Sequence, residues 1–149
     1  MKIRYAKEQE YNLAWEIAKE LPEWFDKNGI INIRIDFNHN NVIVAEDKNK
    51  IVGFLCYTTE CGVGKLIWMG VKKNLQRQGI GLKLLSFLEK ELKKIKIKTI
   101  EVETLPDEDD YEPYKRTRAF YYKNGFKRIE YKKARFKGWD DQILLEKWI

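Results

Sequence analysis

An abrupt change of hydrophobic periodicity in the middle of the chain limits the fold more than any other sequence feature. A short apolar segment that ends at Val71 is rich in strand-forming residues. Apolar residues further on recur at the spacing of one helix face, at Leu84, Leu88, Leu92 and Ile95. Gly79 and Gly81 lie where this helix should begin, although glycine weakens a helix by roughly 1 kcal/mol relative to alanine. The sequence therefore predicts a strand, a turn and a helix N-terminus over residues 71–85.

The two glycines indicate a binding function for this turn. A helix N-terminus offers unpaired backbone N–H groups and a partial positive charge, and glycine has no Cβ to block an approaching anion. The prediction is a phosphate site. The alternative is a helix that starts with flexible residues against a close-packed strand.

Two common phosphate-binding loops do not fit this turn. A Walker A loop needs Ser or Thr after its glycine and lysine, but Leu66 follows Gly64 and Lys65. A dinucleotide-binding fingerprint needs a third glycine where Leu84 stands, and a tighter turn after the strand. The pattern that fits is Q/R-x-x-G-x-G/A, formed by Gln76, Arg77, Gln78, Gly79, Ile80 and Gly81.

The rest of the chain mixes strand and helix patterns, which predicts an α/β (α+β) fold. Strands are expected over residues 2–6, 42–46, 51–58, 65–71, 99–105, 126–132 and 142–148. Helices are expected over residues 9–21, with Leu13, Ile17 and Leu21 on the apolar side, and over residues 23–28, 79–95 and 114–123. Residues 30–41 fit a strand or a loop. Because a helix connects them, the strands at 65–71 and 99–105 should be parallel.

The composition is that of a globular protein. A chain of 149 residues fits one domain, residues 1–149. It has no apolar run of the roughly 20 residues that cross a membrane and no signal-peptide pattern, so we expect a cytoplasmic protein without membrane contact. Cys56 and Cys61, without a histidine cluster, predict neither a metal site nor a disulfide. The net charge of +6 leaves nucleic-acid binding as an alternative, but no recognised motif supports it.

The glycine turn resembles the pyrophosphate-binding loop of the GNAT acyltransferase superfamily. Val71 ends the preceding strand as in that family, and residues 117–126, TRAFYYKNGF, resemble the family's F/L-Y-x-x-x-G-F element. The resemblance implies the GNAT fold, with a mixed, mostly antiparallel central sheet of about six or seven strands flanked by helices. It also implies direct transfer of an acetyl group from acetyl-CoA to a primary amine of a small molecule or protein in a ternary complex, without a metal.

The resemblance assigns roles to single residues. Backbone N–H groups from Gln76 through Gly81 would bind the pyrophosphate. The main chain of Met69, Gly70 and Val71 would pair with the pantetheine arm, and Phe120 would add to the cofactor site. Tyr121, four residues before Gly125, has the position from which the family's tyrosine protonates the departing CoA thiolate. The other interpretation of Tyr121 is a packed helix aromatic, like Phe120 beside it.

A base is also required, because an amine with a pKa of about 10.4 is almost entirely protonated at pH 7. Glu101 and Glu103 are candidates, since alternate residues of a strand share one face, and Glu103 is our prediction. Both also fit as solvent-facing partners of lysines. The acids between Asp107 and Glu112 lie in the loop that borders the acceptor entrance in the family. They predict a cationic acceptor, or else a solvated turn.

Three functions remain open from the sequence. The first is an acetyl-CoA-dependent N-acetyltransferase, and the second is a GNAT-like sensor that binds acyl-CoA without transferring the acyl group. The third is a basic nucleic-acid-binding domain. A homodimer is a further expectation, because the family often dimerises.

Overall fold

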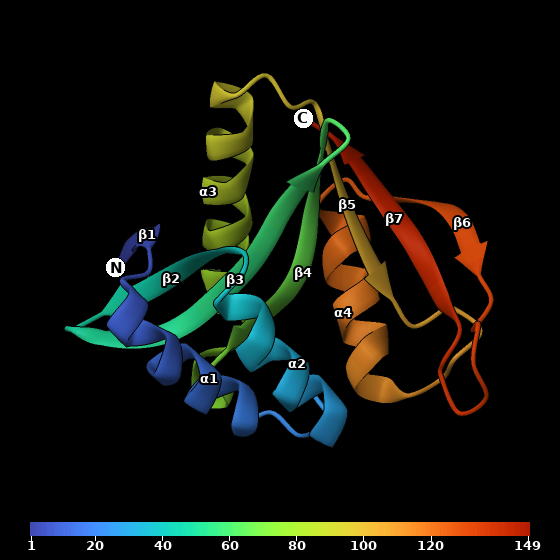
Figure 1. The fold of residues 1–149 in the computed structure, drawn as a ribbon, viewed down its shortest axis with the longest axis horizontal. Coiled ribbons are helices and arrows are strands. Elements are labelled where there is room, and N and C mark those ends of the chain that lie inside the picture. Colours follow the sequence, from blue (N-terminus) through green and yellow to red (C-terminus); the bar gives the residue numbers. More distant parts are fainter.

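The computed structural model describes residues 1–149, and its seven strands form one sheet in the order β1-β2-β3-β4-β5-β7-β6 (Figure 1). The strands are β1 (Lys2–Tyr5), β2 (Asn41–Asp47), β3 (Lys50–Glu60), β4 (Val63–Val71), β5 (Thr99–Thr104), β6 (Lys127–Lys132) and β7 (Gln142–Trp148). The helices are α1 (Tyr11–Lys19), α2 (Lys27–Phe37), α3 (Ile80–Lys94) and α4 (Glu112–Lys123), with short 3-10 segments η1 (Glu8–Glu10) and η2 (Lys73–Leu75). The predicted fold class is confirmed. None of the helices is both long and apolar enough to span a membrane.

The sheet divides between β4 and β5. These two strands are parallel, as predicted, whereas every other neighbouring pair in the sheet is antiparallel. Their pairing covers only Gly64–Leu66 of β4 and Ile100–Val102 of β5. Beyond these residues the strands separate, as Figure 1 shows. We call the space between residues 67–71 of β4 and residues 103–104 of β5 the fork.

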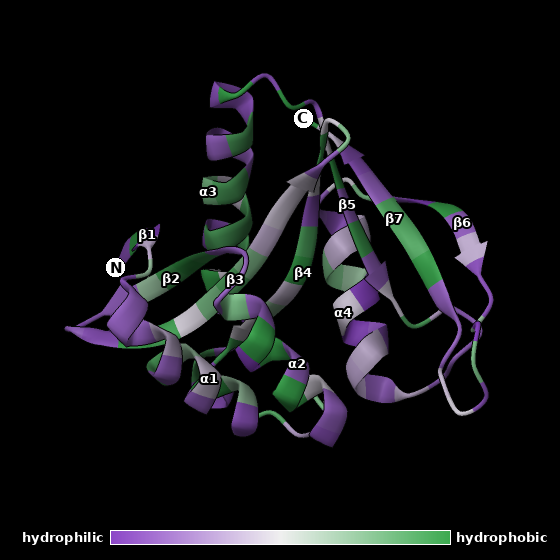
Figure 2. Cartoon of the chain, viewed as in Figure 1, coloured by the Kyte–Doolittle hydropathy of each residue, from purple (hydrophilic) through white to green (hydrophobic).

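Each face of the sheet carries its own hydrophobic core, and Figure 2 shows apolar residues concentrated in the central strands. On one face, α3 buries the predicted leucines Leu84, Leu88 and Leu92 against the strands. Ile95 does not continue this row, because α3 ends at Lys94 and the Ile95 side chain is 59% exposed. Helix α4 adds Tyr121 to the same core.

The opposite face is covered by α1 and α2, with the expected Ile17 and Leu21 buried there. The prediction for Leu13 is wrong, because that side chain is 53% exposed. It lines a cavity of about 380 Å³ beside the β2–β3 turn. Ala14 and Ala18 take the buried positions of α1 instead, and their small side chains let the helix lie close to the sheet.

Residues 23–41 differ most from the expectation. The helix predicted over residues 23–28, which Gly29 was expected to end, does not form: residues 22–24 are a turn, and Lys27 and Asn28 already belong to α2. Gly29 lies in the first turn of α2, where its N–H donates to Asp26 Oδ1 at 2.7 Å. A strand or loop over residues 30–41 is also wrong for most of its length, because α2 continues to Phe37. Ile33 and Phe37 are buried at helical spacing, while Ile31 and Ile35 face solvent.

Asp26 therefore gives a direct test of this part of the fold. The Asp26→Ala variant should lower the free energy of unfolding by about 1 kcal/mol, because the first turn of α2 loses its side-chain cap. Urea denaturation followed by circular dichroism measures the change. Asp26→Asn keeps a capping oxygen and should retain nearly all of the stability. Equal losses in both variants would contradict the capping role.

Candidate functional site

The turn before α3 presents a row of backbone N–H groups that have no partner within the protein. The first backbone hydrogen bond at this end of the helix runs from Lys83 N–H to Gly79 O, at 3.1 Å. The N–H groups of residues 79–82 precede it and donate to no backbone or side-chain acceptor. Four unpaired donors and the positive end of the helix dipole converge here, an arrangement that favours an anion.

Two residues with left-handed backbone conformations shape this turn. Arg77 has φ +64° and Gly79 has φ +85°. A left-handed residue other than glycine is unfavourable, and such positions are concentrated at functional sites. Backbone N–H groups that converge around left-handed residues form concave anion sites. Gln76, Arg77, Gln78, Gly79, Ile80 and Gly81, the predicted phosphate loop, thus form one exposed turn, of which only the Ile80 side chain enters the core.

The two glycines of the turn have different surroundings. A Cβ added at Gly79 would meet nothing within 4 Å, so the space above this amide is open to a ligand. A Cβ at Gly81 would contact the Phe120 ring at 3.6 Å. Phe120 of α4 therefore lies beside the start of α3, and the structure brings this predicted cofactor residue to the phosphate loop.

The end of β4 exposes an unpaired backbone edge toward the fork. Lys72 N–H donates to Val52 O at 2.9 Å, which fixes the direction of the alternating backbone groups. Met69 and Val71 therefore direct their N–H and C=O groups away from β3 and into the fork. One of these groups is already bound, since Gln76 Nε2 donates to Val71 O at 3.1 Å.

Gly70 serves this site differently from its two neighbours. Its register partner is Phe54, so its backbone groups face β3 and not the fork. A Cβ at Gly70 would lie 2.7 Å from Phe54 Cε1, too close for any side chain. Of residues 69–71, only Met69 and Val71 can therefore make the predicted main-chain pairing with the pantetheine arm. Gly70 instead leaves the space that the Phe54 ring occupies in the core.

A β-bulge marks the point at which β4 turns away from β5. Cys56 is paired with Trp68, and the next residue of β3, Tyr57, is paired with Leu66. Ile67 is therefore an extra residue in β4. It follows Leu66, the last residue that pairs with β5, and bulges bend and twist a strand. The bulge supplies a local reason for the fork, and the sequence pattern did not reveal it.

Tyr121 lies on the buried side of α4 and is 4% exposed. Its ring packs edge-on against Phe120 and Phe126, with centroid distances of 5.4 and 5.1 Å. The Tyr121 hydroxyl makes no hydrogen bond within the protein, yet it is not among the fully enclosed unpartnered atoms. Burial raises the pKa of this hydroxyl well above the ordinary tyrosine value. Tyr121 is thus both a packed aromatic and an unpaired proton donor.

Tyr122, the adjacent residue, faces outward. It is 37% exposed, and its hydroxyl donates to Asp107 Oδ2 at 2.8 Å. Partial burial and this carboxylate raise the pKa of Tyr122 to about 12. The two neighbouring tyrosines therefore point to different surroundings, as expected of successive helix residues.

Glu103, the predicted base, is the first residue of β5 beyond the segment paired with β4. Its side chain alternates with those of Val102 and Thr104, which are buried on the α4 side, so it projects from the opposite face. There it binds Lys132 Nζ at 2.6 Å and remains 47% exposed. Glu103 and Tyr121 thus flank the fork from opposite faces of the sheet.

The acidic loop before α4 is bound within the protein. Arg128 binds Asp107 at 2.9 Å and Glu108 at 2.7 Å. Burial alone would raise the pKa of Asp107, but hydrogen bonds from Tyr122 and Arg128 bring it below its usual value. Arg118, which is 4% exposed, donates to Leu105 O and Asp109 O. Asp107 and Glu108 therefore help to hold the loop in place, and because arginines already bind them they give little support to the expected attraction for a cationic acceptor.

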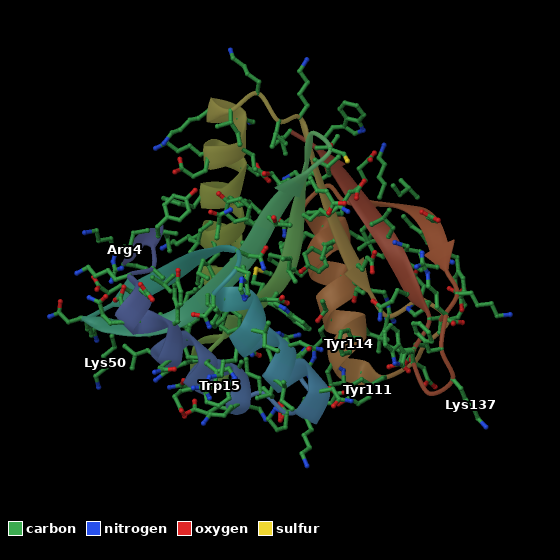
Figure 3. All side chains as sticks on the ribbon, viewed as in Figure 1. Arg4, Trp15, Lys50, Tyr111, Tyr114 and Lys137 are labelled. Carbon is green, nitrogen blue, oxygen red and sulfur yellow. The ribbon has the colours of Figure 1, made fainter.

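The segment between α1 and α2, residues 20–26, crosses to α4 and forms a feature that we call the strap. Trp24 Nε1 donates to Pro113 O and to Thr117 Oγ1, at 3.2 and 3.1 Å. In return, Tyr114 donates to Trp24 O at 2.6 Å and Tyr111 to Glu23 O at 2.7 Å. Both tyrosines lie at the N-terminal end of α4 in Figure 3. Sequence patterns gave no sign of these contacts, which join residues far apart in the chain.

The strap also contacts the segment that follows β4, since Lys73 Nζ lies 3.1 Å from Glu23 Oε2. Lys73 belongs to η2, directly after β4. The strap therefore ties the end of β4 to the N-terminus of α4, across the open end of the fork.

A family model for the acetyltransferase (GNAT) domain matches residues 38–128, more than half of the chain. The chain belongs to the GNAT family of acetyltransferases. The predicted family and enzyme class are thereby confirmed. The matched segment contains the phosphate loop before α3, the fork and Tyr121.

Solved structures show the same GNAT fold at low sequence identity. A structure from Desulfovibrio desulfuricans assigned to the GNAT family has a TM-score of 0.85 and 20% identity, over 97% of this chain and 96% of that one. The ribosomal-protein-S18-alanine N-acetyltransferase of Escherichia coli has a TM-score of 0.75 and 21% identity, over 99% and 93%. PaiA N-acetyltransferase of Thermoplasma acidophilum, in complex with coenzyme A, gives 0.74 and 20%, with full coverage of both chains. No curated protein sequence matches the chain.

Proposed function

We propose that this GNAT domain transfers an acetyl group from acetyl-CoA to a primary amine of a protein or small molecule. The observation that carries the proposal is one continuous set of unpaired groups. The free N–H donors of residues 79–82 lead to the free edge of Met69 and Val71, and Tyr121 has its unpaired hydroxyl on α4. An elongated molecule with an anionic end and an amide-bearing arm, such as acyl-CoA, matches this order.

Each group supplies one part of the transfer. The amides at the start of α3 would hold the pyrophosphate, and the β4 edge would align the arm within the fork. A free N–H on that edge would stabilise negative charge on the thioester oxygen, a contribution of about 3 kcal/mol for one donor in other enzymes. Tyr121 would give its proton to the departing thiolate, and its raised pKa keeps that proton in place at neutral pH.

The two substrates would meet from opposite sides of the sheet. Tyr121 lies on the α3–α4 side, where the phosphate turn also lies, so this is the donor side. Glu103 lies at the fork on the other side, which suits a group that takes a proton from the incoming amine. Such an arrangement permits direct transfer within a ternary complex, without an acylated residue of the enzyme.

The base role of Glu103 can be tested by Glu103→Gln. The variant should lower kcat/KM for the amine about a hundredfold at pH 7, because amine deprotonation loses its acceptor. The Kd for acetyl-CoA should stay the same. Loss of the exposed pair with Lys132 should cost little stability. Steady-state kinetics across pH and calorimetric titration of acetyl-CoA provide the two readouts.

Lys132→Met is the matched control for Glu103→Gln. It breaks the same ion pair but keeps the carboxylate, so kcat/KM should stay within about tenfold of the wild type. If Glu103→Gln is as active as the wild type, another group or a water chain accepts the proton.

Transfer itself is tested with acetyl-CoA and a panel of primary amines that includes peptide N-termini, lysine peptides, polyamines and aminoglycosides. Release of free thiol that depends on the amine, together with an acetylated product of the expected mass, would support the proposal. Tight binding of acetyl-CoA without transfer to any amine would instead identify a sensor module.

A further inference from the structure

The loop between β6 and β7, residues 133–141, carries two exposed aromatic rings that belong to neither core. Phe136 is 59% exposed and Trp139 is 67% exposed. Neither ring packs against the hydrophobic core on either face of the sheet. The rings pack against each other instead, with a centroid distance of 4.7 Å and an interplanar angle of 66°. Exposed apolar side chains that gather in one place are typical of interaction surfaces.

A tight turn fixes the two rings side by side. Trp139 N–H donates to Phe136 O at 3.2 Å, which closes a β-turn. Gly138 has φ +87°, as the third residue of a type II turn requires. The two ends of the loop are joined as well, because Ala134 N–H donates to Asp141 Oδ1 at 2.7 Å. The backbone therefore presents the aromatic pair in a defined arrangement.

The loop also carries positive charge that the protein does not neutralise. Lys133, Arg135 and Lys137 are exposed, and none of them forms an ion pair. Lys137 extends into solvent from the tip of the loop in Figure 3. The Asp141 carboxylate is bound inside the loop, so only Asp140 offers a free negative charge. Three free cations beside two aromatic rings match a polyanion that also has flat apolar groups.

We infer that the loop of residues 133–141 binds single-stranded nucleic acid, with bases stacked on the two aromatic rings and phosphates bound by the three free cations. Phe136 and Trp139 meet edge to face, so each ring keeps at least one face free for a base. Stacking on an aromatic side chain tolerates any base, and flanking cations bind the backbone of the strand. A duplex keeps its base faces inside its own stack, so an unpaired strand fits the loop better. This binding does not depend on acetyl transfer.

The residues around Trp139 favour a nucleic acid over a membrane surface. Asp140 and Asp141 follow Trp139 directly, and Lys137 precedes it by two positions. Insertion of Trp139 into a bilayer would draw these charged groups toward the hydrocarbon region, which is costly. Stacking covers only a ring face and leaves the charged groups in water.

The test measures binding of a labelled single-stranded RNA of about 12 nucleotides by fluorescence anisotropy. Trp139→Ala should raise the Kd for this RNA at least about fivefold, because one stacked base is lost. Trp139→Phe keeps an aromatic ring and should stay within about threefold of the wild type. Lys137→Gln should make the slope of log K against log salt concentration shallower by about 0.7, the change expected for one phosphate contact.

Trp148→Ala is the matched control for Trp139→Ala. Trp148, the last residue of β7, is 71% exposed, and its Nε1 donates to Glu146 at 3.0 Å. It lies outside the loop, so its loss should leave the Kd for RNA unchanged. Because both tryptophans lie at the surface, the Tm of either variant should stay close to that of the wild type.

Four outcomes would overturn the inference. They are no RNA binding by the wild type at low salt, a Kd that Trp139→Ala leaves unchanged, an equal loss in Trp148→Ala, and equal affinity for a duplex of the same sequence. Binding to phosphatidylserine vesicles in place of RNA would assign the loop to a membrane surface and overturn it too. Titration of the wild type with coenzyme A tests the proposed function separately, since failure there would leave RNA binding by the loop intact.

Discussion

Replacing Tyr121 with phenylalanine is expected to lower kcat about a hundredfold, the lower end of the range for a lost general acid. The ring packs between Phe120 and Phe126, and its hydroxyl makes no hydrogen bond, so Phe should preserve the core. The Kd for acetyl-CoA should therefore change less than about twofold. Pre-steady-state and steady-state kinetics with a saturating amine measure the loss. Tyr122→Phe is the matched control, and it should leave kcat unchanged because Tyr122 faces Asp107 at the surface.

Alkaline unfolding offers a second readout for the same variant. Burial raises the Tyr121 pKa in the folded protein above its unfolded value of about 10. Above that pH the unfolded chain releases the proton while the folded protein keeps it, so stability falls as the pH rises. Tyr121→Phe should lose less stability than the wild type above pH 10, as measured by urea denaturation. If the kcat of Tyr121→Phe equals that of the wild type, Tyr121 contributes to packing and not to proton transfer.

Replacing Gly79 with aspartate is expected to raise the Kd for acetyl-CoA about a hundredfold or more. The new carboxylate would occupy the open space above the unpaired amides, where the pyrophosphate is proposed to bind. Two like charges about 4 Å apart near a protein surface repel each other by roughly 4 kcal/mol. Calorimetric titration measures the loss, which should shrink at high salt because the repulsion is partly screened.

Gly79→Asn is the control for size and backbone conformation. Asn and Asp both tolerate the left-handed conformation better than other residues, and only Asp adds charge. Gly79→Asn should therefore bind acetyl-CoA at least about tenfold more tightly than Gly79→Asp. The aspartate should not lower Tm further than the asparagine, since negative charge at a helix N-terminus is favourable. Equal affinities for the two variants would place the anion elsewhere.

Local sequence signals predicted the turn and the flanking elements that we propose bind acetyl-CoA. The glycine turn, the strand before it and the helix after it are contiguous in the chain, and their geometry depends on residues within a few positions. Gly79 adopts the left-handed conformation that glycine favours, and Leu84, Leu88 and Leu92 lie on the buried side as their spacing predicts. The parallel pairing of β4 with β5 followed from the intervening helix.

Features that depend on distant contacts were not predictable in the same way. Ile31, Ile33 and Ile35 alternate like strand residues, yet only Ile33 is buried, because α2 uses the spacing of Ile33 and Phe37. Asp26 in front of Lys27 was the overlooked sign of a helix start. Arg118 has no local sign at all. Its burial depends on carbonyl oxygens of the loop before α4, which only the folded chain brings to it.

The fork also exposes the protein to unwanted strand pairing while no substrate is bound. Where β4 and β5 separate, each acquires a free edge inside the molecule, and free edges are templates for strand addition and aggregation. One carbonyl at the end of each edge is already bound by a side chain. Gln76 binds the carbonyl of Val71 at the end of β4, and Arg118 binds the carbonyl of Leu105 just beyond β5. Trp24 of the strap, together with Tyr111 and Tyr114, which bind the strap, lies across the open end of the fork. A β-strand of a neighbouring molecule therefore finds part of each edge occupied and the open end crossed by the strap, whereas a narrow flexible substrate can still reach the free groups of Met69 and Val71.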